Sequence, residues 1–213
     1  MTKTLIVGID PAAENPEAQK AIAAALLEDA VIAYPTETFY ALGAAAFSRK
    51  AVEKVYRLKR RDAAKPLSVI VSDLDMVRDI AGRLPPAFSI LAGEFWPGPL
   101  TLVLPASPRL PEFLSGPGRT IAVRIPPLVW LRQLVREISQ PLTATSANLT
   151  GAKDLADPTE VAAVFQGKVD LIVDGGPSPG GAPSTIVDLS SAEPRILREG
   201  TIAAVRIRLA LSS

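Results

Sequence analysis

Hydrophobic residues along the chain follow two different periods, and segments of the two kinds alternate from one end to the other. Short runs of branched apolar residues predict strands, whereas apolar positions three or four apart, such as Val52, Val55 and Leu58, predict amphipathic helices. Strands are predicted at residues 3–10, 31–38, 66–72, 100–106, 120–126, 141–148, 169–176, 183–190 and 195–200. Helices are predicted at residues 15–30, 48–59, 72–84, 86–95, 127–139 and 157–167. Because strands and helices interleave without a repeat or a long linker, we predict an α/β fold with a single domain over residues 1–213.

The segment "AYPTETFYALG" interrupts this pattern, because hydroxyl groups and a carboxylate directly follow an apolar strand. Residues 36–38, with the sequence Thr-Glu-Thr, come straight after Pro35. On an extended strand Thr36 and Thr38 point to the same face, where their hydroxyls can pair with a small polar ligand. A strand end capped by its own hydroxyls is the alternative. We interpret the segment as one wall of a ligand site.

The composition narrows the chemistry that such a site can perform. The chain contains no cysteine and no histidine, which excludes disulfides, thiolate zinc sites, a cysteine nucleophile and imidazole acid–base catalysis. Hydrophobic residues make up 48% of the chain, enough for a globular core. No secretory signal and no apolar run long enough to span a membrane are visible. We therefore expect a cytoplasmic protein that works with lysine, arginine, hydroxyl, amide and carboxylate groups.

Positive charge is concentrated in one stretch, although the net charge of the whole chain is only +1. Residues 49–65 carry eight basic and two acidic side chains, whereas the remainder carries 15 basic and 20 acidic ones. The helical part of this stretch is either a solvated basic face or a surface that binds RNA. If the helix ends near Lys59, then Lys59 and Arg61 lie on an extended segment where both can reach one anion. Such a pair suits phosphate oxygens.

A second cation is predicted on a strand at residues 120–126. The three branched apolar residues of this strand alternate with Thr120, Ala122 and Arg124, so these three share the face away from the core. An arginine in such a place is costly without a partner. The partner is either a buried carboxylate of the protein or a carboxylate or phosphate of a ligand.

Two further stretches place small polar residues where strands end or begin. Ser146 and Asn148 leave a predicted strand at its carboxyl end, where α/β proteins often bind ligands, although an ordinary turn gives the same pattern. Ser184 enters a strand after the glycine-rich segment 175–181, and Arg198 lies in the last predicted strand. The glycines permit close backbone approach, but a flexible loop fits the composition equally well. The chain lacks the P-loop motif, and "GPGRTI" lacks the third glycine of a dinucleotide fingerprint.

Taken in order along the chain, seven stretches resemble the YrdC-like family of threonylcarbamoyl-AMP synthases. The matching stretches are "YPTETFYALG", "KRRDAAKPL", "WPGPLTLVL", "AVRIP", "TATSAN", "GGAPSTIVDL" and "ILREG". They cover roughly residues 18–204, and the chain resembles the short members that lack a C-terminal extension. The resemblance implies a YrdC-like fold, in which helices flank a twisted mixed sheet with a concave basic cleft.

The resemblance also implies a reaction, in which L-threonine, bicarbonate and ATP give threonylcarbamoyl-AMP and pyrophosphate. The product would serve a downstream tRNA threonylcarbamoyl transferase, and Mg²⁺ is expected to arrive with ATP. By motif match, the implied catalytic residues are Lys59 and Arg61. The implied threonine-binding residues are Thr38, Arg124, Ala144 and Ser184. The implied nucleotide-binding residues are Lys59, Arg61, Lys65, Thr120, Ser146, Asn148 and Arg198.

This reaction is compatible with a chain that has no cysteine or histidine, because the nucleophile is the substrate itself. A carbamate formed on the threonine amine attacks the α-phosphorus, and pyrophosphate leaves. Two other functions stay open: a YrdC-like protein of a sister branch that binds tRNA or double-stranded RNA, and a related enzyme that forms a carbamoyl adenylate from carbamoyl phosphate. The chain departs from the family pattern at Ala41, Asp62, Lys65 and Ile70.

Overall fold

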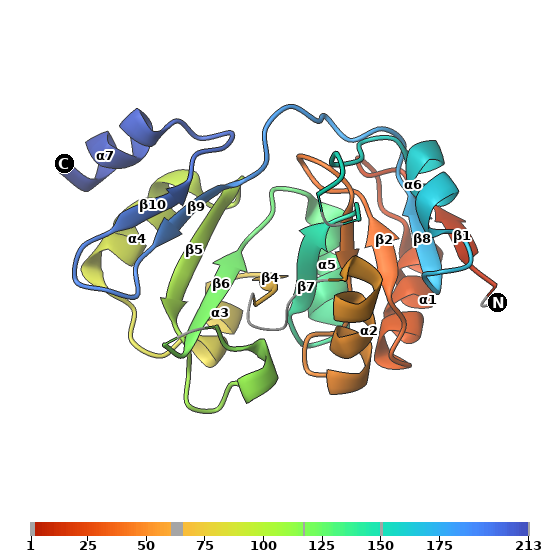
Figure 1. The fold of residues 1–213 in the computed structure, drawn as a ribbon, viewed down its shortest axis with the longest axis horizontal. Helices are drawn as coiled ribbons and strands as arrows, with labels where there is room; N and C mark the ends of the chain where they lie inside the picture. The colour runs from red at the N-terminus through yellow and green to blue at the C-terminus, as the bar shows by residue number, and fades with distance from the viewer. Residues whose placement is uncertain (1–2, 61–65, 117, 150, 213) are drawn as a thin grey trace.

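Helices and strands alternate along the chain in the order that the hydrophobic pattern predicts (Figure 1). The computed structural model describes residues 3–60, 66–116, 118–149 and 151–212. The strands are β1 (Leu5–Gly8), β2 (Ile32–Tyr34), β3 (Ala41–Gly43), β4 (Ser68–Ile70), β5 (Leu100–Pro105), β6 (Thr120–Arg124), β7 (Leu142–Ser146), β8 (Leu171–Asp174), β9 (Thr185–Asp188) and β10 (Arg195–Arg198). The helices are α1 (Pro16–Leu27), α2 (Arg49–Lys59), α3 (Leu74–Ile80), α4 (Pro86–Phe95), the 3-10 helix η1 (Glu112–Leu114), α5 (Val129–Glu137), α6 (Pro158–Phe165) and α7 (Ala204–Ser212).

The ten strands in the described part of the chain form one mixed sheet, in the order β1-β8-β2-β3-β7-β4-β6-β5-β9-β10. Four neighbouring pairs are parallel, namely β1–β8, β2–β8, β4–β6 and β5–β9. At one edge, Leu5 of β1 lies opposite Leu171 of β8, so an early and a late segment pair. At the centre, β4 pairs with β7, with Ser68 opposite Ala144. This central pair joins the two halves of the sheet.

Each face of the sheet carries its own apolar core, and β2 shows how alternate residues divide between them. Ile32 and Tyr34 pack in the smaller core with residues of α1 and α5. Ala33, which lies between them, packs in the larger core with residues of α2 and α6, the helices nearest the viewer over this half in Figure 1. This division follows from the two-residue period of a strand, and it explains why β2 is apolar throughout.

Several elements of the structure differ from the sequence prediction, and the 3-10 helix η1 is one that was not predicted. The predicted strand 31–38 ends at Tyr34, and the chain bends before a short strand, β3, that the pattern did not show. The C-terminal helix α7 was not predicted. In contrast, α2 ends at Lys59 as expected, because Arg60 adopts a left-handed conformation that stops the helix.

A crossover of residues 175–184 connects β8 to β9 and passes along one side of the sheet (blue, top of Figure 1). The amide of Gly180 donates a hydrogen bond to the carbonyl of Thr38 at 2.7 Å. The hydroxyl of Tyr40 donates to the carbonyl of Gly176 at 2.8 Å. These bonds hold the crossover against the bend that follows β2, and they fix one rim of the space described below.

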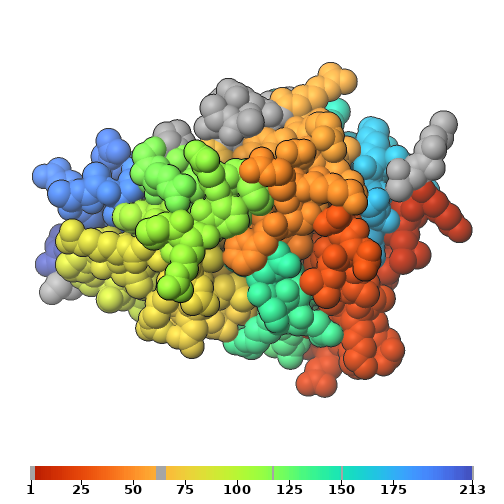
Figure 2. All heavy atoms as spheres, turned by 90° about the horizontal axis from the view of Figure 1, so that it is seen from below, coloured from red at the N-terminus to blue at the C-terminus, as the bar shows by residue number. Residues whose placement is uncertain are grey.

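A second contact between the two halves lies on the opposite side of the molecule. In Figure 2 the green segment that contains η1 lies beside the orange segment that contains α2. The guanidinium carbon of Arg49 stands 4.6 Å from the centre of the Phe113 ring, which is a cation–π contact. The two halves are therefore connected on both sides of the central strands, and not only through the pairing of β4 with β7.

Candidate functional site

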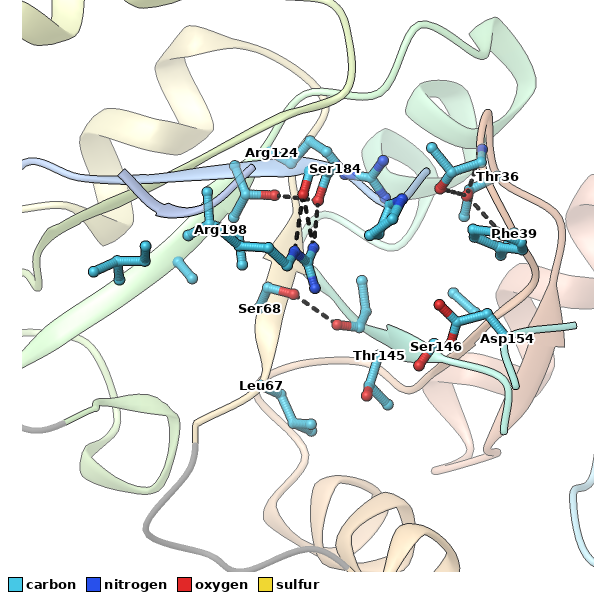
Figure 3. A pocket seen from close by; sticks show the side chains of 18 of the residues that line it. Thr36, Phe39, Leu67, Ser68, Arg124, Thr145, Ser146, Asp154, Ser184 and Arg198 are labelled. Atoms are coloured by element: carbon cyan, nitrogen blue, oxygen red, sulfur yellow. Dashed lines mark hydrogen bonds between the residues drawn. The ribbon is translucent and has the colours of Figure 1, made fainter. Parts of the chain in front are cut away.

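Strand ends and loops from both halves of the sheet enclose a cavity of about 310 Å³. One wall consists of the bend after β2 and the carboxyl end of β7, and the other consists of residues from β5, β6, β9 and β10. The start of β4 lies between them. Figure 3 shows side chains from the two walls pointing toward a shared space. The cavity therefore lies where segments distant in sequence converge.

Arg124, at the carboxyl end of β6, lines this cavity and forms an ion pair with Glu37. The two side chains are only 8% and 11% exposed. Burial lowers the pKa of Arg124 to about 10, Tyr34 opposes this shift, and the neighbouring Arg198 adds to it. The guanidinium still carries its charge at neutral pH, so it provides a fixed cation. Of the two predicted partners for Arg124, the structure shows the carboxylate of the protein.

The hydroxyl oxygens of Thr36 and Thr38 lie 3.1 Å apart and both residues line the cavity, as expected, but they stand on a bend. The prediction that they belong to a strand is wrong. The Thr36 hydroxyl donates to the carbonyl of Phe39 at 2.7 Å and accepts from the amide of Thr38 at 3.2 Å. Local side-chain bonds of this kind compete with strand pairing and turn the chain. The bend presents both hydroxyls to the cavity.

A second cation, Arg198, enters the cavity from the end of β10 (Figure 3). Its guanidinium donates to the Ser184 carbonyl at 3.1 and 2.8 Å and to the Ser184 hydroxyl at 3.2 Å. The Ser184 hydroxyl is also 3.0 Å from that of Thr101. Burial lowers the pKa of Arg198, while the charge of Asp154 raises it. This wall therefore offers two guanidiniums, those of Arg124 and Arg198, and two hydroxyls.

Lys59, the last residue of α2, is 3% exposed, and its ammonium group holds the turn after β7. It donates to the Ser146 carbonyl at 2.7 Å, to the Asn148 carbonyl at 2.8 Å and to the Asn148 side-chain oxygen at 2.5 Å. Asn148 donates in turn to a carboxylate oxygen of Asp154 at 2.9 Å. Ser146 and Asp154 line the cavity, so the cluster connects a buried cation to its wall.

The structure brings most of the described candidate residues to this one cavity. The candidates that line it are Thr38, Arg124, Ala144, Ser146, Ser184 and Arg198. Lys59 and Asn148 contact Ser146 but are not among the residues of the lining. Thr120 is not among them either, because it begins the strand that Arg124 ends. Four steps along the strand, from Thr120 to Arg124, span roughly 13 Å.

Two candidate cations, Arg61 and Lys65, lie outside the described residues. Among the described residues of the lining, the charged side chains are Arg124, Arg198 and Asp154. The pairing of Lys59 with Arg61 around a phosphate, and the basic cleft as a whole, therefore stay predictions.

Several polar residues of the site were not among the sequence candidates, and Glu37, Ser68 and Asp154 are three of them. Glu37 is the ion-pair partner of Arg124. The sequence did indicate this residue, because a carboxylate that follows an apolar strand needs a cation nearby if it is buried. Ser68 lines the cavity and donates to the Ala144 carbonyl at 2.7 Å. Asp154 reaches the lining from the loop after β7, and the sequence carried no signal for it.

The described residues contain no group of three or more acidic side chains placed to hold a metal ion. No helix in the described part of the chain is both long and apolar enough to cross a membrane.

Fixed cations and hydroxyls at the strand ends of an α/β sheet are typical of proteins that bind a small charged ligand. The model of the Sua5/YciO/YrdC family, described as "Telomere recombination", matches residues 24–200. The chain therefore belongs to the Sua5/YciO/YrdC family, which confirms the resemblance to YrdC-like proteins.

Two similar curated proteins are both called threonylcarbamoyl-AMP synthase. The protein from Pyrococcus abyssi (strain GE5 / Orsay) is 38% identical over 173 residues, which cover 81% of this chain and 51% of the relative. The protein from Bacillus subtilis (strain 168) is 38% identical over 208 residues, which cover 97% of this chain and 60% of the relative. The chain thus spans between one half and two thirds of the length of these relatives.

Solved structures confirm the predicted fold. Sua5 of P. abyssi, described as complexed with L-threonine, aligns with a TM-score of 0.90 and 33% identity, over 99% of this chain and 61% of that one. YciO of E. coli aligns with a TM-score of 0.85 and 26% identity, over 97% of this chain and 99% of that one. The α/β fold with its mixed sheet is therefore shared with Sua5 and YciO.

Proposed function

We propose that this protein is a threonylcarbamoyl-AMP synthase, which converts L-threonine, bicarbonate and ATP into threonylcarbamoyl-AMP and pyrophosphate. Family membership and two relatives that carry this name over most of the chain support the proposal. A structural neighbour described as a complex with L-threonine supports the amino-acid substrate.

The observation that carries the proposal is the two-sided cavity. One wall offers a buried guanidinium, Arg124, together with the hydroxyl of Ser184, and the hydroxyl of Thr38 belongs to the wall opposite. A guanidinium and hydroxyls suit the carboxylate and hydroxyl of threonine. The turn that Lys59 holds lies on the other side, with Ser146 in the lining. Two ligands of different chemistry can therefore meet in one cavity.

The mechanism needs no nucleophile from the protein. The threonine ammonium loses one proton, and the neutral amine then attacks the carbon of CO₂, which bicarbonate supplies with loss of hydroxide. The second amine proton and this hydroxide leave as water. The resulting carbamate oxygen attacks the α-phosphorus, and pyrophosphate leaves. The protein's task is to align two anionic reactants and to neutralise phosphate charge. Alignment alone can lower the barrier by roughly 7–11 kcal/mol. In this scheme Arg124 orients threonine, Arg61, Lys65 and Arg198 bind the nucleotide, and Lys59 holds the turn that carries Ser146 beside it.

Mg²⁺ is part of the proposal, as a counter-ion of the triphosphate. Magnesium sites in nucleotide enzymes commonly use one or two carboxylates together with phosphate oxygens. Asp154 is a carboxylate of the described lining, and it fits this pattern. Asp154 would hold the ion together with the phosphates, and the ion would neutralise charge on the leaving pyrophosphate.

A substrate-omission assay tests the proposed reaction. Pyrophosphate release should require L-threonine, bicarbonate and ATP together, and mass spectrometry should detect threonylcarbamoyl-AMP. Pyrophosphate release that is unchanged without threonine would reject the proposal. A parallel reaction with carbamoyl phosphate in place of bicarbonate and threonine tests the related carbamoyl-adenylate activity, which should be absent.

A second candidate function, RNA binding, is favoured by the exposed cations of α2. The side chains of Arg49, Lys50 and Arg57 are 64%, 71% and 68% exposed. Such a face suits a phosphate backbone, either of tRNA or of another double-stranded RNA, and would place the product near a downstream tRNA threonylcarbamoyl transferase. Binding to RNA should weaken steeply with salt, and substituting the α2 cations should flatten this dependence.

A further inference from the structure

The ion pair between Arg124 and Glu37 presents the two charges that a free amino acid carries. An amino acid at neutral pH has one carboxylate and one ammonium group. Within this pair the guanidinium of Arg124 lines the cavity, and the carboxylate of Glu37 lies immediately next to it. The Arg124–Glu37 pair is thus complementary in charge to a zwitterionic ligand. When such a ligand binds, the protein pair and the ligand can exchange partners without leaving a charge unpaired.

The contacts of Glu37 are incomplete in a way that points to such an exchange. One carboxylate oxygen accepts from Arg124, but the other is buried and has no hydrogen-bond partner in the described structure. The nearest hydroxyls in sequence do not fill this position, because those of Thr36 and Thr38 lie against each other and the Phe39 carbonyl. A buried carboxylate oxygen without a donor is costly, and such groups often have a functional reason.

The position of Glu37 in the chain permits the exchange. It stands on the bend after β2, between two residues that line the cavity, and not within a paired strand. A glutamate side chain has three rotatable bonds, so its carboxylate can move from Arg124 toward the cavity without a change in the sheet.

We propose that Glu37 determines specificity for the free α-amino group. In this exchange, the ligand carboxylate takes the place of Glu37 on Arg124, and Glu37 binds the ligand ammonium group. A ligand that has only a carboxylate would leave Glu37 buried and unpaired. A ligand that has only an ammonium group would leave Arg124 buried and unpaired. Both cases are unfavourable, so the site selects zwitterions. The inference rests on the proposed function, because it takes an amino acid to be the ligand of Arg124.

The test compares ligands that differ only in one charged group. Titration calorimetry would measure the affinity of L-threonine, of (R)-3-hydroxybutanoate, which lacks the amino group, and of L-threoninol, which lacks the carboxylate. The wild-type protein should bind L-threonine roughly 100-fold more tightly than either analogue. In Glu37→Gln the preference over (R)-3-hydroxybutanoate should fall to about fivefold or less. Glu37→Asp, which keeps the charge, should retain most of the preference.

A purely structural role for Glu37 gives a different result. If Glu37 only holds Arg124 in place, then Glu37→Gln should lower the affinities for L-threonine and (R)-3-hydroxybutanoate by the same factor. The ratio of the two affinities should then not change. That outcome would overturn the inference. Glu193→Gln, at an exposed position, is the matched control and should behave as wild type. The wild-type ratio is informative by itself, because it does not depend on the folding of any variant.

A second ligand pair separates this inference from the proposed function. L-Serine and 3-hydroxypropanoate differ in the same way as the threonine pair. If L-threonine does not bind, but L-serine binds with a preference that Glu37→Gln abolishes, then the proposed substrate is wrong and the role of Glu37 stands. If the wild-type protein prefers neither amino acid over its deaminated analogue, the role of Glu37 is refuted.

Discussion

Replacing Lys59 with methionine removes an ammonium group that the structure buries between α2 and the turn after β7. Methionine has a similar length, so the change removes charge and donors with little loss of volume. Among the described residues, the ammonium donates to the backbone carbonyls of Ser146 and Asn148 and to the Asn148 side chain. The side-chain oxygen keeps the Ser146 hydroxyl as a donor at 2.9 Å, so the two carbonyls carry most of the effect.

The size of this effect follows from those two carbonyls. A hydrogen bond to a charged group contributes about 1.5–3 kcal/mol to stability. Removing the buried charge also removes the cost of desolvating it, which offsets part of that loss. We therefore expect Lys59→Met to lower the free energy of unfolding by about 3 kcal/mol. For a domain of this size, that corresponds to a melting temperature lower by roughly 6–12 °C. Calorimetry or circular dichroism would measure it, and pyrophosphate release should be lost in the same variant.

The matched control is Lys54→Met, five residues earlier on the same helix. The Lys54 side chain is 34% exposed and donates to the carbonyl of Asp29 at 3.0 Å, so its replacement should cost less than about 1 kcal/mol. If Lys59→Met melts within about 2 °C of the wild-type protein, the argument is wrong, because the ammonium would not be holding the turn. Unchanged stability together with lost activity would instead indicate that Lys59 serves phosphate binding alone.

Two further changes test the fold around the site. Gly43→Ala would place a Cβ against the backbone carbonyl of Thr143 and the ring of Tyr34. Urea unfolding should show that it destabilises the protein by about 1–3 kcal/mol. Gly8→Ala is the control: its Cβ would have nothing within 4 Å, and it should cost less than about 1 kcal/mol. Asp73→Ala removes the N-cap of α3 and should cost about 1 kcal/mol at pH 7. A hydrogen bond from the first turn of α3 is the main cause that lowers the pKa of Asp73, so its contribution is complete above the unfolded value near 3.9. The difference between wild type and Asp73→Ala should therefore shrink as the pH falls below about 4, and a constant difference down to pH 2 would contradict this assignment.

The sequence predicted most helices and strands because their apolar residues recur with a clear period. Helix α7 was missed for the opposite reason. Its apolar residues Val205, Ile207, Leu209 and Leu211 alternate with other residues, as in a strand. In the structure Ile207 is buried while Val205 and Leu209 are 58% and 64% exposed, so packing against α4 overrides the local pattern. Strand β3 was missed because three apolar residues after a bend show no period at all.

The candidate site was predictable where it depended on local rules. Alternation along β6 correctly put Ala122 and Arg124 on the cavity side, but alternation gives a face and not a distance, so it also selected Thr120. The partner of Arg124 could not be identified by spacing, because Glu37 is 87 residues away in sequence. Only the folded sheet brings these two residues together.

The pairing of the first strand with the eighth has a consequence for synthesis of this protein on the ribosome. Leu5 of β1 has its sheet partner at Leu171, which is translated 166 residues later. At about 5–20 residues per second, the nascent N-terminal segment waits roughly 8–33 s for β8 to emerge. During that interval the backbone of residues 5–8 has no strand to pair with, so the edge of the sheet formed by β1 is completed only after β8 has been made.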